Sequence, residues 1–206
     1  MERRLLRSFA TSALISVATT GCHATMSTPP PSSTPTELPE GGYSNVGTEW
    51  PLKFRAHRFS VSTYSTYGCR VVYGGRVRAD DPEAKLQSSS EALGSRYPDN
   101  MTASMGPIGN FPPPAKVTWR SRDGTPLEAE IDIGEIFKDE LIRHHVARED
   151  ALDPASSGTP GIILEVNDRT INVYMRDMIA LKKPRFPDRP HSDFRDDLIK
   201  VFSRTY

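Results

Sequence analysis

The class of fold follows most directly from the segment Ala115-Lys-Val-Thr-Trp-Arg-Ser-Arg-Asp-Gly-Thr-Pro-Leu-Glu-Ala-Glu-Ile-Asp-Ile133. In both halves apolar residues alternate with polar ones, which is the period of a strand that packs one face on a core. Asp123-Gly124 separates the halves and supplies the positive φ angle that a tight hairpin turn requires. The segment therefore predicts a β-hairpin, with a solvated acidic face formed by Glu128, Glu130 and Asp132.

The same alternation appears on both sides of this hairpin. Residues 161–181 predict a second hairpin, because Asn167-Asp168-Arg169 separates two apolar-alternating runs and Asn and Asp tolerate turn geometry. Residues 50–78 predict two or three strands, punctuated by glycines. The tail, residues 193–206, predicts a last strand after a helical turn.

Two segments carry helix signals. Asp80-Asp81-Pro82-Glu83 predicts the start of a short helix, since proline suits the first helical position. Apolar residues at helical spacing predict an amphipathic helix within residues 134–146. Together the segments predict an α+β fold of predominantly antiparallel β-hairpins with one or two helices.

The N-terminus predicts export. Residues 1–21 are basic and then apolar, as in a signal peptide, and the apolar run is about half of the roughly 20 residues that a membrane span needs. Thr19-Thr20-Gly21-Cys22 resembles the lipobox of bacterial lipoproteins, and that resemblance implies lipidation of Cys22. The Pro/Ser/Thr-rich residues 22–48 predict a flexible tether, which leaves residues 49–206 as a single globular domain.

The cysteines leave two alternatives open. If Cys22 carries lipid, Cys69 has no disulfide partner, and an unpaired cysteine is expected to be buried as a small apolar side chain. If an ordinary signal peptidase cuts the chain instead, the protein is soluble in the periplasm and a disulfide between Cys22 and Cys69 becomes possible. The mass of the mature protein, with or without acyl chains, separates the two.

Charge and motifs exclude several classes of function. The chain has 26 Lys and Arg against 26 Asp and Glu, which predicts neither a basic field for nucleic acid nor a polybasic patch for a membrane surface. The common nucleophile, zinc and phosphate-loop motifs do not occur in the sequence. His144 and His145 would point about 100° apart on a helix and so rarely bind one metal ion. We therefore predict no catalytic residue, no metal and no cofactor.

The second half of the chain resembles a known family. The resemblance rests on four segments, Val117 to Gly124, Ile131 to Lys138, Ile163 to Met175 and Ser192 to Leu198. They are similar to proteobacterial lipoproteins that occur beside type VI secretion phospholipase effectors and are regarded as their immunity proteins. The resemblance implies a protein without enzymatic activity or small-molecule substrate, which binds and inhibits a cognate phospholipase in the periplasm. His23, where an Asp would favour the inner membrane, suggests anchoring in the outer membrane.

Two long loops, residues 96–114 and 148–160, are the expected contact surface for that partner. Their length, their apolar side chains and their acidic content suit a protein interface. The predicted contact residues are Met101, Met105, Phe111, Glu149 and Asp150. Two competing functions remain, a structural or envelope-assembly lipoprotein and a periplasmic enzyme with an unrecognised site.

Overall fold

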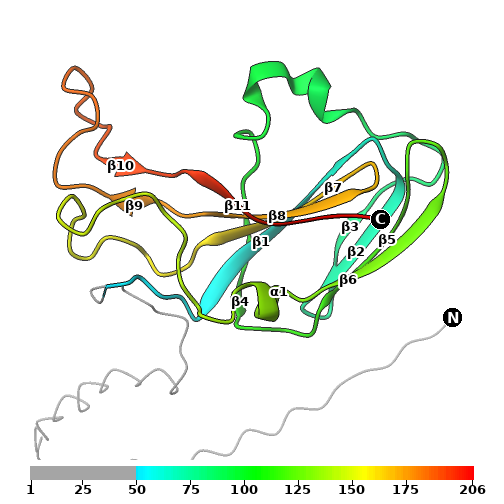
Figure 1. The fold of residues 1–206 in the computed structure, drawn as a ribbon, viewed down its shortest axis with the longest axis horizontal. Coiled ribbons are helices and arrows are strands. Elements are labelled where there is room, and N and C mark those ends of the chain that lie inside the picture. Colours follow the sequence, from blue (N-terminus) through cyan, green and yellow to red (C-terminus); the bar gives the residue numbers. More distant parts are fainter. Residues whose placement is uncertain (1–49) are drawn as a thin grey trace, which may run out of the picture. The chain divides into compact units, whose positions relative to one another are not determined.

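The computed structural model describes residues 50–206, and this part of the chain is built on two larger β-sheets and a small third one (Figure 1). The predicted signal peptide, the lipobox with Cys22 and the whole of the predicted tether lie outside the described residues. The fold is α+β and predominantly antiparallel, as the sequence predicts. No helix within residues 50–206 is long and apolar enough to cross a membrane.

The larger sheet has five strands, in the order β11-β8-β7-β1-β4. Neighbours pair antiparallel except β1 and β7, which run parallel. Hairpin β7-β8 confirms the second hairpin predicted from sequence, and Asp168 in its turn has a φ of 53°. The strands are β1 (Ala56–Tyr64), β4 (Met105–Gly109), β7 (Gly161–Asn167), β8 (Thr170–Arg176) and β11 (Leu198–Thr205).

The smaller sheet has four antiparallel strands, in the order β3-β2-β5-β6. Hairpin β5-β6 confirms the segment that predicted the fold class, and Glu128 and Glu130 on its outer face are exposed. The strands are β2 (Tyr67–Tyr73), β3 (Arg76–Asp80), β5 (Ala115–Arg120) and β6 (Pro126–Ile131).

One apolar core joins the two sheets. Val71, Val117 and Trp119 from the smaller sheet belong to the same buried cluster as Leu164 and Val173 from the larger one. Cys69 on β2 is also buried in this cluster, as predicted for an unpaired cysteine.

Strands β7 and β8 are buried on both faces. Their second face is covered by residues 89–104, which contain the short helix η1 (Ser90–Arg96) and arch over the sheet in Figure 1. Met101 from this segment packs against Ile163 and Tyr174 in a second apolar cluster. We call residues 89–104 the covering segment.

A third, small sheet lies at one end of the described part. It pairs β9 (Ile179–Ala180) with β10 (Phe194–Arg195), and Ala151 adds an isolated bridge to Leu181. The chain between β9 and β10 projects away from the two larger sheets in Figure 1. This end of the molecule carries the candidate site.

Three sequence predictions of helix are wrong. The segment after Asp80 is irregular, and the chain before β11 forms β10 where a helical turn was expected. The helix predicted within residues 134–146 is reduced to one turn, α1 (Ile133–Ile136). Beyond it, the backbone nitrogens of Phe54 and Ile142 donate to Glu140 and Leu52, so the chain pairs with the residues before β1 and cannot continue as a helix.

Candidate interaction site

The structure separates the predicted contact residues into two groups. Met101 is only 2% exposed, so the expectation that it is an exposed interface residue is wrong. Its thioether chain fills the space between the covering segment and the sheet. A side chain buried in this way cannot reach a partner.

Met105 and Phe111 are half-buried, and their segment is part of the fold. Met105 begins β4, which pairs with β1 at the sheet edge, where Pro107 is tolerated. The Phe111 ring packs edge-to-face on Phe54, with 5.8 Å between ring centroids. Residues 96–114 therefore serve mainly to cover and extend the larger sheet.

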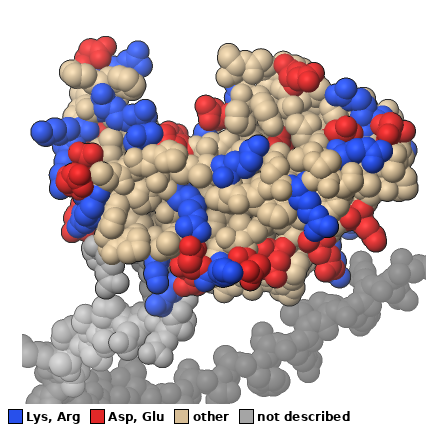
Figure 2. Space-filling model, in the orientation of Figure 1, with Lys and Arg blue, Asp and Glu red and all other residues tan. Residues whose placement is uncertain are grey.

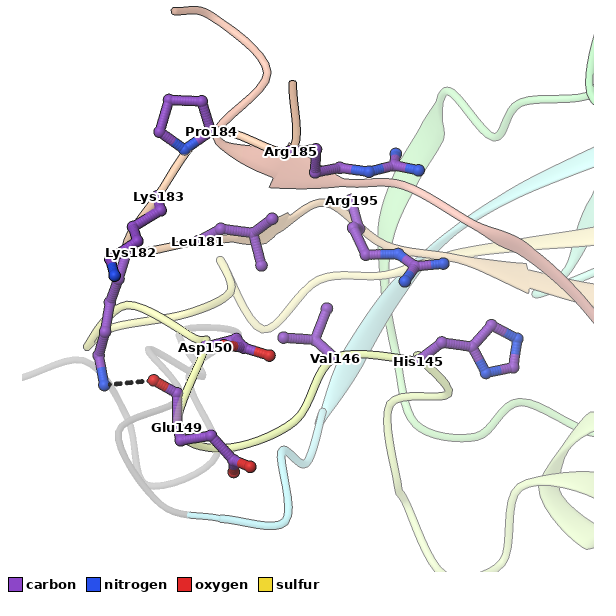
Figure 3. A pocket seen from close by; sticks show the side chains of 10 residues that line it. All are labelled: His145, Val146, Glu149, Asp150, Leu181, Lys182, Lys183, Pro184, Arg185 and Arg195. Carbon is purple, nitrogen blue, oxygen red and sulfur yellow. Dashed lines mark hydrogen bonds between the residues drawn. The ribbon is translucent and has the colours of Figure 1, made fainter. Parts of the chain in front are cut away.

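Glu149 and Asp150 are exposed, and both line the same hollow (Figure 3). The hollow has a volume of about 460 Å³ and lies between residues 145–150 and the chain around β9 and β10. Val146 and Leu181 provide its apolar surface, while most other lining side chains are charged. We call it the charged pocket.

Backbone contacts hold the two walls of the charged pocket together. The Lys182 ammonium donates to the main-chain carbonyl of Glu149 at 2.7 Å, drawn as a dashed line in Figure 3. The backbone nitrogen of Lys182 donates to the carbonyl of Asp150 at 2.9 Å. Because both contacts use main-chain oxygens, the carboxylates of Glu149 and Asp150 remain available to a ligand.

Cations outnumber carboxylates around the pocket. Arg185 and Arg195 extend in the same direction in Figure 3, and Lys182 and Lys183 lie on the same wall. Arg195 is paired with Asp197, with 2.8 Å between Nε and Oδ2. The pocket thus combines guanidinium, ammonium and carboxylate groups, which suit recognition of a charged protein surface.

The loop between β9 and β10 carries an exposed aromatic ring. Phe186 is 44% exposed and lies between two guanidinium groups, 5.4 Å from that of Arg185 and 5.3 Å from that of Arg189. Ser192 ties the loop together, because its hydroxyl accepts from the backbone nitrogen of Phe186 and donates to the carbonyl of Arg189. The ring is therefore presented by an ordered loop.

The buried polar residues of the described part form hydrogen-bonded clusters. His57 lies on β1 and is fully buried, with Nδ1 3.0 Å from Asn110 and Nε2 3.0 Å from the Tyr73 hydroxyl. Burial lowers the pKa of His57, so the ring is neutral. The hydroxyl of Ser156 donates to Asp177, and burial raises the pKa of that carboxyl.

The two hydroxyl pairs, Tyr73 with His57 and Ser156 with Asp177, are buried and do not line the charged pocket. The ten residues that line the charged pocket include no hydroxyl or thiol side chain. Burial raises the pKa of the Cys69 thiol to about 12, which keeps it protonated. The lining of the charged pocket thus suits ionic recognition better than nucleophilic catalysis.

The histidine pair does not assemble a metal site. The Nδ1 atom of His144 accepts from the backbone nitrogen of Val146, and its ring packs on Trp50. His145 lines the charged pocket instead. Within residues 50–206 no three His, Cys, Asp or Glu side chains are grouped as metal ligands are.

Sequence reasoning missed the basic wall of the pocket. Residues 182–190 carry no strand or helix signal, but Lys182-Lys-Pro-Arg-Phe-Pro187 combines cations with an aromatic ring. That combination of Arg with an exposed aromatic residue is common in interfaces and was the available signal. No protein-family model, no curated protein and no solved structure matches the chain.

Proposed function

We propose that this protein is a non-catalytic, lipid-anchored periplasmic protein that binds and inhibits a phospholipase effector of a type VI secretion system. The class of partner comes from the resemblance of the second half of the chain to immunity lipoproteins. The observation that carries the binding role is the charged pocket, which Glu149 and Asp150 line together with four cations, Lys182, Lys183, Arg185 and Arg195.

The pocket has the properties of a recognition surface. Its walls are loops joined by hydrogen bonds to main-chain carbonyls. The fold therefore positions the carboxylates of Glu149 and Asp150 without using them in its own hydrogen bonds. Mixed charges at an interface fix the orientation of a partner and speed its association. Arg185 and Phe186 add side chains of the types that dominate binding energy in protein interfaces.

A double charge reversal tests this proposal. Glu149→Lys with Asp150→Lys should weaken inhibition of the cognate phospholipase by roughly tenfold or more, because two carboxylates at the interface are replaced by ammonium groups that repel the cations they would pair with. Inhibition constants are measured with purified effector on phospholipid substrate. The backbone contacts to Lys182 do not depend on either side chain, so the variant should fold.

The matched control is Glu128→Lys with Glu130→Lys. Both residues are exposed on the outer face of β6, away from the charged pocket, and the change in charge is identical. This control should inhibit as the parent protein does. Equal inhibition by parent, pocket variant and control would contradict the assignment of the pocket, and no binding of any form to the effector would contradict the proposed function itself.

A further inference from the structure

The loop between β9 and β10 concentrates positive charge that the neutral composition of the chain conceals. Residues 182–191, which we call the basic tip, hold four cations, Lys182, Lys183, Arg185 and Arg189, against one carboxylate, Asp188. Figure 2 shows several blue side chains at this end of the molecule, with fewer red ones among them. Residues 182–191 therefore carry a local excess of cations that the overall charge of the chain does not show.

The cations of the basic tip are not neutralised by ion pairs. Within residues 50–206, Lys183, Arg185 and Arg189 have no carboxylate within salt-bridge distance, whereas nine other ion pairs form elsewhere. Lys182 donates to a main-chain carbonyl, which leaves its charge uncompensated. The tip thus presents free positive charge to its surroundings.

Exposed apolar side chains gather at the same end. The described residues include six large apolar side chains that are exposed, and four of them lie on or beside the small sheet, Leu152, Met178, Phe186 and Phe194. Met178 is the most exposed of all, at 60%. Isolated exposed apolar residues are ordinary, but a group of four at one end indicates a surface that binds a membrane or another protein.

The small sheet explains this grouping, because it is amphipathic. Ala180 pairs with Phe194 on β10, and the Ala180 carbonyl accepts from the backbone nitrogen of Leu152. Leu152 and Phe194 therefore lie on either side of Ala180. The neighbouring residues Ile179 and Leu181 point to the opposite face and are buried. One face of the small sheet therefore joins the core, and the other exposes apolar groups beside the basic tip.

We infer that the basic tip and the exposed face of the small sheet form a membrane-contact surface that binds anionic phospholipid headgroups. Free lysine and arginine side chains are attracted to a negatively charged lipid surface. Aromatic and aliphatic side chains beside them enter the boundary between headgroups and acyl chains, while the long cationic side chains remain in the headgroup layer. This surface shares Lys182, Lys183 and Arg185 with the charged pocket, and it is separate from lipidation of Cys22.

Charge favours a lipid surface over a second protein as the occupant. The tip offers several unpaired cations around one exposed ring, and a lipid surface supplies many mobile phosphates to meet them. An acidic protein surface is the competing occupant, and the experiment below separates the two.

Vesicle binding tests the inference. The full chain carrying Cys22→Ser, which removes the lipid acceptor, is floated with vesicles of phosphatidylcholine and phosphatidylglycerol, or of phosphatidylcholine alone. We expect binding to the anionic vesicles that weakens as salt is added. Lys183→Glu with Arg189→Glu should reduce that binding by at least fivefold for each cation removed, and Phe186→Ser by roughly tenfold.

The matched control is Lys85→Glu with Arg96→Glu, an identical change of charge at two exposed residues away from the small sheet. This control should bind anionic vesicles as the Cys22→Ser parent does, and all variants should unfold at the same urea concentration. Equal vesicle binding by parent and tip variants would overturn the inference. The inference would also be overturned if the tip variants lost effector binding but bound vesicles as the parent does.

The two proposals fail separately in these experiments. Glu149→Lys with Asp150→Lys should lose effector inhibition and keep vesicle binding, since it adds positive charge beside the tip. The tip variants should lose vesicle binding whether or not the effector is present.

Discussion

Glu165 on β7 has a buried side chain whose two oxygens accept hydrogen bonds from hydroxyl and amide groups and from no cation. Its Oε1 accepts from the Tyr97 hydroxyl at 2.8 Å and the Asn167 amide at 3.4 Å. Its Oε2 accepts from the Asn172 amide at 2.8 Å and the Tyr174 hydroxyl at 2.9 Å. Because Tyr97 follows η1 in the covering segment, this carboxylate joins the covering segment to the sheet.

Replacing Glu165 with an apolar residue should be strongly destabilising. Glu165→Leu leaves two hydroxyls and two side-chain amides without this acceptor, and should lower the free energy of unfolding by about 3 kcal/mol. Glu165→Gln keeps an acceptor oxygen and should cost less. Urea unfolding measures both, with the exposed Glu128→Gln as the control, which should stay within about 0.5 kcal/mol of the parent. Equal stability of Glu165→Leu and the parent would refute the structural role of the network.

His57 should make the stability of the protein sensitive to acid. Burial lowers its folded pKa below the ordinary value of 6.5, although the hydrogen bond with Asn110 opposes this and the charge of Arg78 adds to it. The unfolded chain then binds the proton more readily than the folded one. This contribution to stability is complete above 6.5 and is lost as pH falls towards the folded pKa.

The test compares the parent with His57→Gln across that range. The free energy of unfolding of the parent should fall more steeply below pH 6.5 than that of His57→Gln. Asp177 has a raised pKa and acts in the opposite sense, since its contribution is lost as pH rises from 3.8 to its folded pKa. The difference between the two proteins at each pH removes that effect, and parallel curves would show that His57 is not the group responsible.

Among the secondary-structure elements, the hairpins were predictable and the helices were not. The β5-β6 and β7-β8 hairpins are local, so their alternation and their turn residues contain the whole signal. The helical spacing within residues 134–146 is equally clear, but Leu52 and Phe54 offer this segment backbone partners from far away in sequence. Tertiary pairing of that kind overrides local propensity and leaves no local trace.

The covering segment depends on a small residue beneath it. A side chain at Gly161 on β7 would place its Cβ 2.8 Å from the Cβ of Ala103. Gly161→Ala should therefore lower the free energy of unfolding by about 1 to 3 kcal/mol through overpacking. The double variant with Ala103→Gly should recover much of that loss, as urea unfolding of the four proteins in the cycle would show. If the two changes altered the free energy of unfolding additively, residues 161 and 103 would not be in steric contact.

At the scale of the whole molecule, the predicted anchor has a testable purpose. An inhibitor tethered beside the membrane gains effective concentration where a phospholipase acts. Cys22→Ser should bind the effector in vitro as tightly as the parent and should protect cells less well. The measurement is survival of cells that receive the effector, at matched amounts of inhibitor. Equal protection would show that the lipid only directs the protein to its compartment.

The candidate site was half predictable at this scale. Glu149 and Asp150 were found because a polar loop must lie on the surface, and they do line the charged pocket. Met101 was misplaced because no local pattern shows that residues 89–104 fold back over the sheet. The basic wall was missed because its partner loop is more than thirty residues away, as the contact between Lys182 and Glu149 shows.

The parallel pairing of β1 with β7 also governs how quickly the chain can fold. Arg58 and Gly161 are partners about a hundred residues apart, so this pair cannot form until the chain has been made as far as β7. A chain that emerges from its N-terminus exposes β1, with the apolar Phe59, long before β7 arrives. The nascent chain therefore passes through an interval of aggregation risk, and a chaperone that holds extended strands would raise the yield of folded protein.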